Sequence, residues 1–245
     1  MYRVSFGPQP LQLRAWDTAD VEDRLKHVTF GHRWDDPERV FRSLYTASTM
    51  VGAFIETLQD LRPALDFLAH IQSVELESGE EAPNYTTLDS SYLNNRYACK
   101  LLVRRQYTYF INAAHVDFIG VVRDSLPRLA IELGIKAIDL SSLLGPDREF
   151  TQAVSRYAWS FGYAGIFSPS SLGLPGENWT FFEDRHESNF YRVELVPDTP
   201  IAITIDHPDL IEALNALHMT VDGDTSLLTA ERRGFGQVFV VETDP

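Results

Sequence analysis

Apolar residues recur at helical spacing in five segments of the chain. The clearest example places Val154, Tyr157, Ala158 and Phe161 at positions i, i+3, i+4 and i+7, which is one face of a helix. The predicted helices span residues 49–58, 61–71, 125–133, 151–161 and 208–217. Ser48 and Thr151 are placed to cap the first and fourth of them, because a hydroxyl can accept from the free N–H groups of the first turn.

Short runs rich in β-branched and aromatic residues predict strands between these helices. They span residues 2–6, 40–45, 98–103, 106–112, 136–140, 165–168, 179–182, 191–196, 201–205 and 238–242. Residues 78–95 have no apolar period and predict a long loop, either a binding loop or a solvated excursion. Strands and helices do not alternate regularly, so the pattern predicts an α+β fold with mainly antiparallel strands.

Length and composition agree with a folded protein of one large domain, or one domain with an extension. The chain has 245 residues, 44% of them hydrophobic, which is enough for a sizeable core. No apolar run reaches the length of a membrane span and the chain opens without a signal peptide, so we expect a cytoplasmic protein. The single cysteine, Cys99, has no internal disulfide partner and is expected to be a small core residue.

The charge of the chain argues against a nucleic-acid-binding protein. Its formal net charge is −14, whereas a protein that grips DNA or RNA usually presents a basic face. The acidity instead favours solubility or a basic partner. The seven histidines form no metal-binding pattern and there is no cysteine pair, so no metal is expected.

Residues 31–56 hold the densest group of candidate functional side chains. Arg33 and Trp34 lie beside a predicted turn, a predicted strand ends in Tyr45, and Glu56 lies on the following helix, off its apolar face. The unit therefore predicts a polar site at a strand-to-helix corner. In isolation these residues fit equally well a solvated arginine, a core tryptophan and a surface glutamate.

These four residues, in this order, resemble the first block of the RES-domain family: an arginine, an aromatic residue, a strand ending in tyrosine and a helix carrying glutamate. The second block is similar to Ala137–Leu140, then residues 151–161, then the Gly165–Ser170 segment. In that segment the matching serine is Ser170, with Ser168 and Ser171 as rivals. Arg3 matches the arginine that opens the family's domain, and the likeness covers about residues 1–185.

The resemblance implies an ADP-ribosyltransferase-like core, with short strands in two sheets around a cleft for NAD. It divides the chain into a RES-like NAD-binding domain, residues 1–185, and a part, residues 186–245, that completes or extends it. It also implies the toxin half of a bacterial toxin–antitoxin pair, with a small helix-turn-helix antitoxin as its protein partner and NAD as its substrate. Direct binding to nucleic acid or membrane is not expected.

The implied reaction is cleavage of the nicotinamide–ribose bond of NAD, with phosphate or water as acceptor. In it Glu56 would organise the nicotinamide ribose, while Arg33 and Arg3 would hold the phosphates, because guanidinium groups suit phosphate oxygens. Trp34 and Tyr45 would stack on the nicotinamide or adenine ring or hydrogen-bond the ribose. The Ser170 hydroxyl would bind a ribose or phosphate oxygen.

Two other functions stay open at this stage. The ADP-ribose could go to a protein target, or the chain could be a catalytically degenerate binding module. The second is motivated by the acidic residues after Trp34, namely Asp35, Asp36 and Glu38, whose charges would oppose a pyrophosphate. Asn178 is a further candidate for the site, and Arg42 is expected to be solvated.

Overall fold

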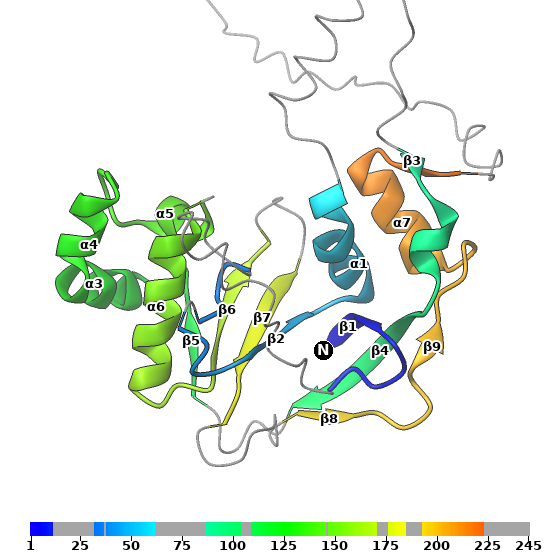
Figure 1. The fold of residues 1–245 in the computed structure, drawn as a ribbon, viewed down its shortest axis with the longest axis horizontal. Coiled ribbons are helices and arrows are strands. Elements are labelled where there is room, and N and C mark those ends of the chain that lie inside the picture. The colour runs from blue at the N-terminus through cyan, green and yellow to red at the C-terminus, as the bar shows by residue number, and fades with distance from the viewer. Residues whose placement is uncertain are drawn as a thin grey trace, which may run out of the picture.

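The computed structural model describes residues 1–11, 32–36, 38–61, 87–103, 109–145, 147–170, 176–184 and 193–222. Within these ranges the chain forms an eight-stranded sheet, a two-stranded sheet and surrounding helices (Figure 1). The parallel pairings are β5 with β6 and β10 with β3, and the other strand pairings are antiparallel. The predicted α+β class with mainly antiparallel strands is confirmed.

The large sheet has the strand order β5-β6-β7-β2-β1-β4-β8, with β9 also paired to β4, and the small sheet joins β10 to β3. The strands are β1 (Tyr2–Phe6), β2 (Ser43–Ala47), β3 (Thr87–Leu88), β4 (Arg96–Val103), β5 (Phe110–Asn112), β6 (Gly165–Pro169), β7 (Glu177–Phe182), β8 (Val193–Leu195), β9 (Ile201–Ala202) and β10 (Thr220–Val221). The order places β2 between β7 and β1, strands that are far from each other in sequence.

The helices gather in two groups at opposite ends of this sheet, as Figure 1 shows. The first group lies by β5 and β6 and contains α3 (Val116–Ser125), α4 (Pro127–Glu132), α5 (Leu140–Leu144) and α6 (Arg148–Ser160). The second lies by β1 and β4 and contains α1 (Met50–Leu58), the 3-10 turns η3 (Gln59–Leu61) and η4 (Ser90–Leu93), and α7 (Pro208–Leu217). In the described part of the chain no helix is long and apolar enough to cross a membrane.

Each group of helices buries its own apolar cluster. Phe150 and Val154 of α6 pack with Ile166 of β6, whereas Phe54 of α1 packs with Leu214 of α7. A third cluster contains the side chains of Leu44, Leu101, Phe181 and Val193. Because side chains alternate along a strand, Leu44 in this cluster leaves its neighbour Tyr45 on the face that α6 covers.

Several predicted elements are confirmed with small changes of boundary. The bounds of β1 and α7 are those expected, and Cys99 is a fully buried core residue. The strand expected at residues 40–45 instead runs from Ser43 to Ala47. Asp36 Oδ2 accepts a hydrogen bond from the backbone N–H of Val40 at 2.5 Å, so that part of the chain turns before it can enter the sheet.

Two predicted helix caps are wrong. Thr49, and not Ser48, caps α1, by accepting from Gly52 N at 3.0 Å. The Ser48 hydroxyl accepts from the backbone N–H of Glu177 in β7 instead. Helix α6 begins at Arg148, and Asp147 caps it. Thr151 therefore lies inside the helix.

The strand expected at residues 136–140 is also wrong. These residues form no strand, and Asp139 begins α5 through a capping box with Ser142. The carbonyl of Ile138 accepts from Arg123 Nη2 at 3.3 Å, so a side chain takes the place of a neighbouring strand. Helix α3 was not predicted, and α4 is shorter than the helix expected at 125–133.

Other expectations fall partly or wholly outside the described residues. The helix at 61–71, the strand at 238–242 and the first part of the loop at 78–95 lie there. The described end of that loop contains β3 and η4. Strands β8 and β9, from the C-terminal part, both pair with β4, so this part adds strands to the same sheet.

Candidate functional site

The strand-to-helix corner between β2 and α1 is tightly packed around Gly52. A Cβ atom at this position would lie 2.9 Å from Thr49 Oγ1 and 3.3 Å from Ala47 Cβ. Glycine therefore lets the first turn of α1 lie close to the end of β2. The corner connects Tyr45 of β2 to Glu56, which lies one turn further along α1 than Gly52.

Arg33 is held by carbonyl groups at the end of α5. Its Nη1 donates to the carbonyl oxygens of Gly145 at 2.5 Å and Leu143 at 3.2 Å. Burial lowers the pKa of the Arg33 guanidinium, while the nearby negative charge of Glu56 acts in the opposite direction. The positive charge of Arg148, at the start of α6, lowers that pKa further. Arg33 therefore lies within electrostatic range of both Glu56 and a second arginine.

Two side-chain amides hold the carboxylate of Glu56. Asn178 Nδ2 donates to Oε1 at 2.7 Å and Gln59 Nε2 donates to Oε2 at 2.8 Å. Asn178 comes from β7 and Gln59 from the 3-10 turn after α1. The sequence analysis names Asn178 as a further candidate and does not include Gln59. The i+3 spacing of Gln59 from Glu56 is the signal that could have identified it.

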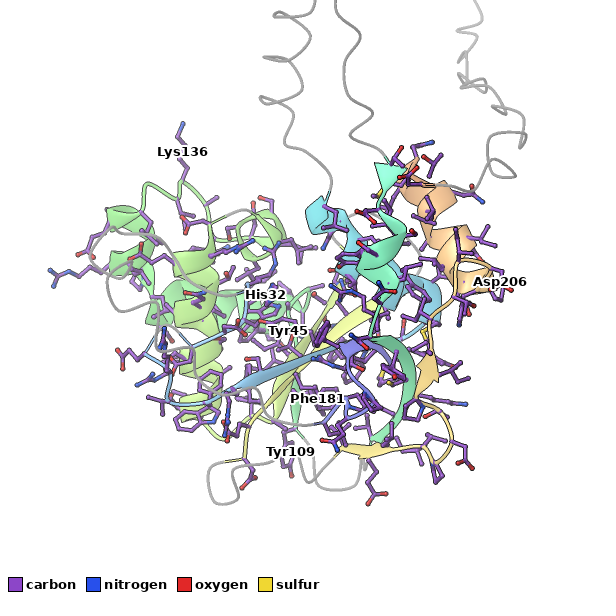
Figure 2. The ribbon with its side chains drawn as sticks, turned by 45° about the vertical axis from the view of Figure 1, so that its right-hand side comes forward. His32, Tyr45, Tyr109, Lys136, Phe181 and Asp206 are labelled. Carbon is purple, nitrogen blue, oxygen red and sulfur yellow. The ribbon has the colours of Figure 1, made fainter. Side chains whose placement is uncertain are left out.

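The phenol of Tyr45 lies next to His32 (Figure 2). His32 opens the segment 32–36 that carries Arg33, which we call the arginine-bearing loop. Its hydroxyl donates to Asp35 Oδ1 at 2.9 Å and accepts from the backbone N–H of Trp34 at 3.0 Å. Burial raises the pKa of Tyr45 well above its ordinary value, and the charge of Asp35 adds to the effect. Tyr45 is thus a neutral group that fixes the loop carrying Arg33.

Arg3 and Trp34 both hydrogen-bond to this tyrosine. Arg3 Nη1 donates to the carbonyl of Tyr45 at 2.8 Å, and its Nε is buried with no hydrogen-bond partner among the described residues. Burial lowers the pKa of Arg3. The indole of Trp34 is only 4% exposed and packs in the core with Phe41 and Phe182, so little of its ring surface is available for stacking on a ligand.

Ser170 lines a cavity of about 230 Å³ beside the Glu56–Asn178 pair. The cavity is lined by Ala47, Ser48, Thr49, Val51, Gly52, Ile55, Ser170, Gly176, Glu177, Asn178, Glu212 and Ala216. Of the two rival serines, Ser168 is 4% exposed in β6 and Ser171 lies outside the described residues. The cavity therefore joins the predicted serine to the amide that holds Glu56.

The acidic residues after Trp34 bind partners in their own loop and on α6. Both carboxylate oxygens of Asp36 accept from Arg156 Nη1, at 2.7 and 2.8 Å, and Glu38 Oε2 accepts from Arg156 Nη2 at 2.7 Å. Asp35 receives the Tyr45 hydroxyl and the backbone N–H of His32. Their charges are therefore engaged by partners within the protein, which weakens the electrostatic objection to a phosphate site.

Arg42 differs from its expected solvated state. Its guanidinium is paired with Glu183, with Nε to Oε2 at 2.8 Å and Nη2 to Oε1 at 2.5 Å. The Glu183 side chain is 8% exposed. This bidentate pair joins the residue before β2 to the residue after β7. It is a structural contact.

A comparison with protein-family models matches the RES domain over residues 2–204. The chain belongs to the RES domain family. Among solved structures, a chain of the M. tuberculosis MbcT–MbcA toxin–antitoxin complex is similar at 16% identity, with a TM-score of 0.40; the match covers 80% of this chain and 79% of that one. No curated protein gives a significant match.

The described RES-domain residues include no group of three or more His, Cys, Asp or Glu side chains able to hold a metal ion. The polar groups that they bring together are instead those suited to an anionic, hydroxyl-bearing ligand. Arg33 and Arg148 supply positive charge, Glu56 a carboxylate, and Ser170 and Asn178 neutral polar groups.

Proposed function

We propose that this RES domain protein is a toxin that cleaves the nicotinamide–ribose bond of NAD, with phosphate or water as acceptor, and so depletes cellular NAD. The supporting observation is the Glu56 carboxylate, held by Asn178 beside the cavity that Ser170 lines, within a chain that matches the RES domain. Arg33 lies within electrostatic range of this carboxylate. A site for this reaction needs positive charge for the phosphates and negative charge for the sugar, and both are present.

In the proposed reaction the bond between C1 of the ribose and the ring nitrogen of nicotinamide breaks. Its electron pair goes to the nitrogen, and nicotinamide leaves as a neutral molecule. The sugar develops positive charge, which the carboxylate of Glu56 stabilises. A phosphate oxygen or a water oxygen then attacks C1, and water loses a proton in that step.

The remaining residues of the site have proposed roles in binding. Arg33 binds a phosphate of the dinucleotide, with the charge of Arg148 nearby. Ser170, on the cavity wall, binds a ribose or phosphate oxygen. Arg3 and Tyr45 act by supporting the arginine-bearing loop. Arg3 donates a hydrogen bond to the Tyr45 carbonyl, and the Tyr45 hydroxyl accepts one from the backbone N–H of Trp34.

We also propose that a small helix-turn-helix antitoxin neutralises the protein in the cytoplasm. Membership of the RES family supports this proposal, and the net charge of −14 fits a partner with basic residues. The test is co-expression with a candidate gene from the same operon. Rescue of growth together with co-purification is expected, and rescue without a complex would argue against neutralisation by binding.

The function is tested by nicotinamide release from NAD by purified protein, with and without phosphate. Glu56→Gln keeps the shape of the side chain and removes its charge, so we expect the rate to fall by roughly 10²–10³-fold. Glu132→Gln is the matched control, because Glu132 forms an exposed pair with Arg128 on α4. Well-folded protein that releases no nicotinamide would overturn the proposal.

The two assay conditions also separate the acceptors. A rate that rises with phosphate indicates phosphorolysis, and a rate independent of phosphate indicates hydrolysis. Transfer to a protein target would instead attach label from NAD to a protein band in a lysate. Glu56→Gln should abolish that band if the same site is responsible.

A further inference from the structure

The carboxylate of Glu56 is held from two independent directions. One amide donor, Asn178, comes from a strand that is 122 positions away in sequence, and the other, Gln59, from the turn that continues α1. Each oxygen of the carboxylate receives one of them. This arrangement restricts both the rotamer of Glu56 and the rotation of its carboxylate plane.

The backbone of Asn178 is anchored on both sides. It pairs with Ala47 of β2 and with Ser168 of β6, so it lies in the interior of the sheet. Directly opposite side chains share a face of an antiparallel sheet. Ala47 on that face is small, which leaves room for the Asn178 amide to reach α1. Gly52, where a Cβ would lie only 3.3 Å from Ala47 Cβ, brings α1 close enough for the contact.

Neutral donors suit the chemistry proposed for Glu56. An amide orients a carboxylate and stabilises its charged form without cancelling the charge. A carboxylate has about four acceptor positions, so it can accept from more than the two amides. A positioned charge stabilises a developing cation better than one that must first reorient.

We propose that Asn178 and Gln59 are positioning residues that orient the Glu56 carboxylate for bond cleavage. This inference rests on the proposed function, in which Glu56 is the catalytic group. It assigns a role to both residues, one of which, Asn178, also lines the cavity together with Ser170.

The test compares isosteric variants that replace each donor by an acceptor. Asn178→Asp and Gln59→Glu are expected to lower kcat about 10–100-fold, the cost of one or two hydrogen bonds to a charged group. KM should change much less, because the phosphate contacts remain. The acid limb of the pH profile of kcat/KM should move to higher pH, since a second carboxylate disfavours ionisation of Glu56.

Asn215→Asp is the matched control, because Asn215 lies on the exposed side of α7 and the substitution has the same charge. It should leave kcat and the pH profile unchanged. A Glu56 that needs no positioning would give normal kcat in both site variants, and this result would overturn the inference while leaving the proposed function intact.

A second measurement does not depend on turnover. NMR titration of labelled glutamate side chains follows the ionisation of Glu56 directly in the unmodified protein and in each variant. Its midpoint should rise in Asn178→Asp and Gln59→Glu and stay fixed in Asn215→Asp. If the unmodified protein releases no nicotinamide, the proposed function fails, and the titration still decides whether the amides act on Glu56. An unchanged midpoint in folded variants would overturn the inference.

Discussion

The stability of the arginine-bearing loop should depend on one buried acid, Asp36. Its side chain is fully buried, with 0% exposure, and it accepts four hydrogen bonds: two from Arg156, one from Val40 N and one from Glu38 N. Glu38 binds the same arginine, but its side chain is 71% exposed. The two acids therefore share Arg156 as a partner, and they differ in burial and in the two backbone N–H groups that bind Asp36.

Asp36→Ala removes the acceptor of all four bonds, including those from the backbone N–H groups of Val40 and Glu38. Arg156 is 32% exposed and stays paired with Glu38, so the expected loss is that of hydrogen bonds to a charged group, about 1.5–3 kcal/mol of the free energy of unfolding. For a chain of this size 1 kcal/mol corresponds to roughly 2–4 °C, so Tm should fall by roughly 3–12 °C. Glu38→Ala removes an exposed pair and should cost about 0–1 kcal/mol.

The assay is denaturant unfolding of both variants, together with Arg156→Ala and the double variant Asp36→Ala/Arg156→Ala. The cycle isolates the energy of the Asp36–Arg156 pair. Nicotinamide release should fall in Asp36→Ala, because the same loop carries Arg33. Equal losses of stability in Asp36→Ala and Glu38→Ala would refute the argument, because burial would then not decide the energy of the pair.

Two other substitutions test the packing that supports the site. Tyr45→Phe leaves the Trp34 N–H without its acceptor and should cost about 1–3 kcal/mol in unfolding experiments near neutral pH. Because folding raises the pKa of Tyr45, its contribution to stability is complete below about pH 10 and is lost as pH rises further. Between pH 9 and 11 the Tyr45→Phe variant should therefore lose less stability than the unmodified protein. An equal loss in the two proteins would contradict this expectation. Gly165→Ala would place a Cβ 2.0 Å from the Thr180 carbonyl oxygen and should unfold the β6–β7 pairing, seen as a large loss of Tm. Gly162→Ala, where φ is +83° but the space is open, is the control and should cost only about 1 kcal/mol; similar Tm values for the two would be the contrary result.

The candidate site was predictable as far as it is local in sequence. The order Arg33, Tyr45, Glu56 on loop, strand and helix was predicted, and the structure places their elements at one corner. The Glu56 partner Asn178 was a secondary candidate, because a sequence carries no record of which strands pair. The role of Trp34 also could not be decided from the sequence, since both a ligand-stacking ring and a core ring fit its pattern. It is buried because it packs in the apolar cluster that contains residues of α6.

The sequence by itself determined the local elements whose signals lie within one helical turn or one strand. Helix α7 runs from Pro208, a residue suited to a first turn, and its apolar period fixes the buried face. The single cysteine, the net charge and the ordered motif of the RES family were also available without a structure.

Only the tertiary structure decided between local signals of similar strength. Ser48 and Thr49 are both suitable caps, and the choice falls to Thr49 because β7 supplies a backbone N–H to the Ser48 hydroxyl. Residues 136–140 have strand composition, but Arg123 takes the Ile138 carbonyl and Asp139 begins a helix. Sheet order is likewise decided by contacts between distant segments, and it is this order that places Asn178 against Glu56.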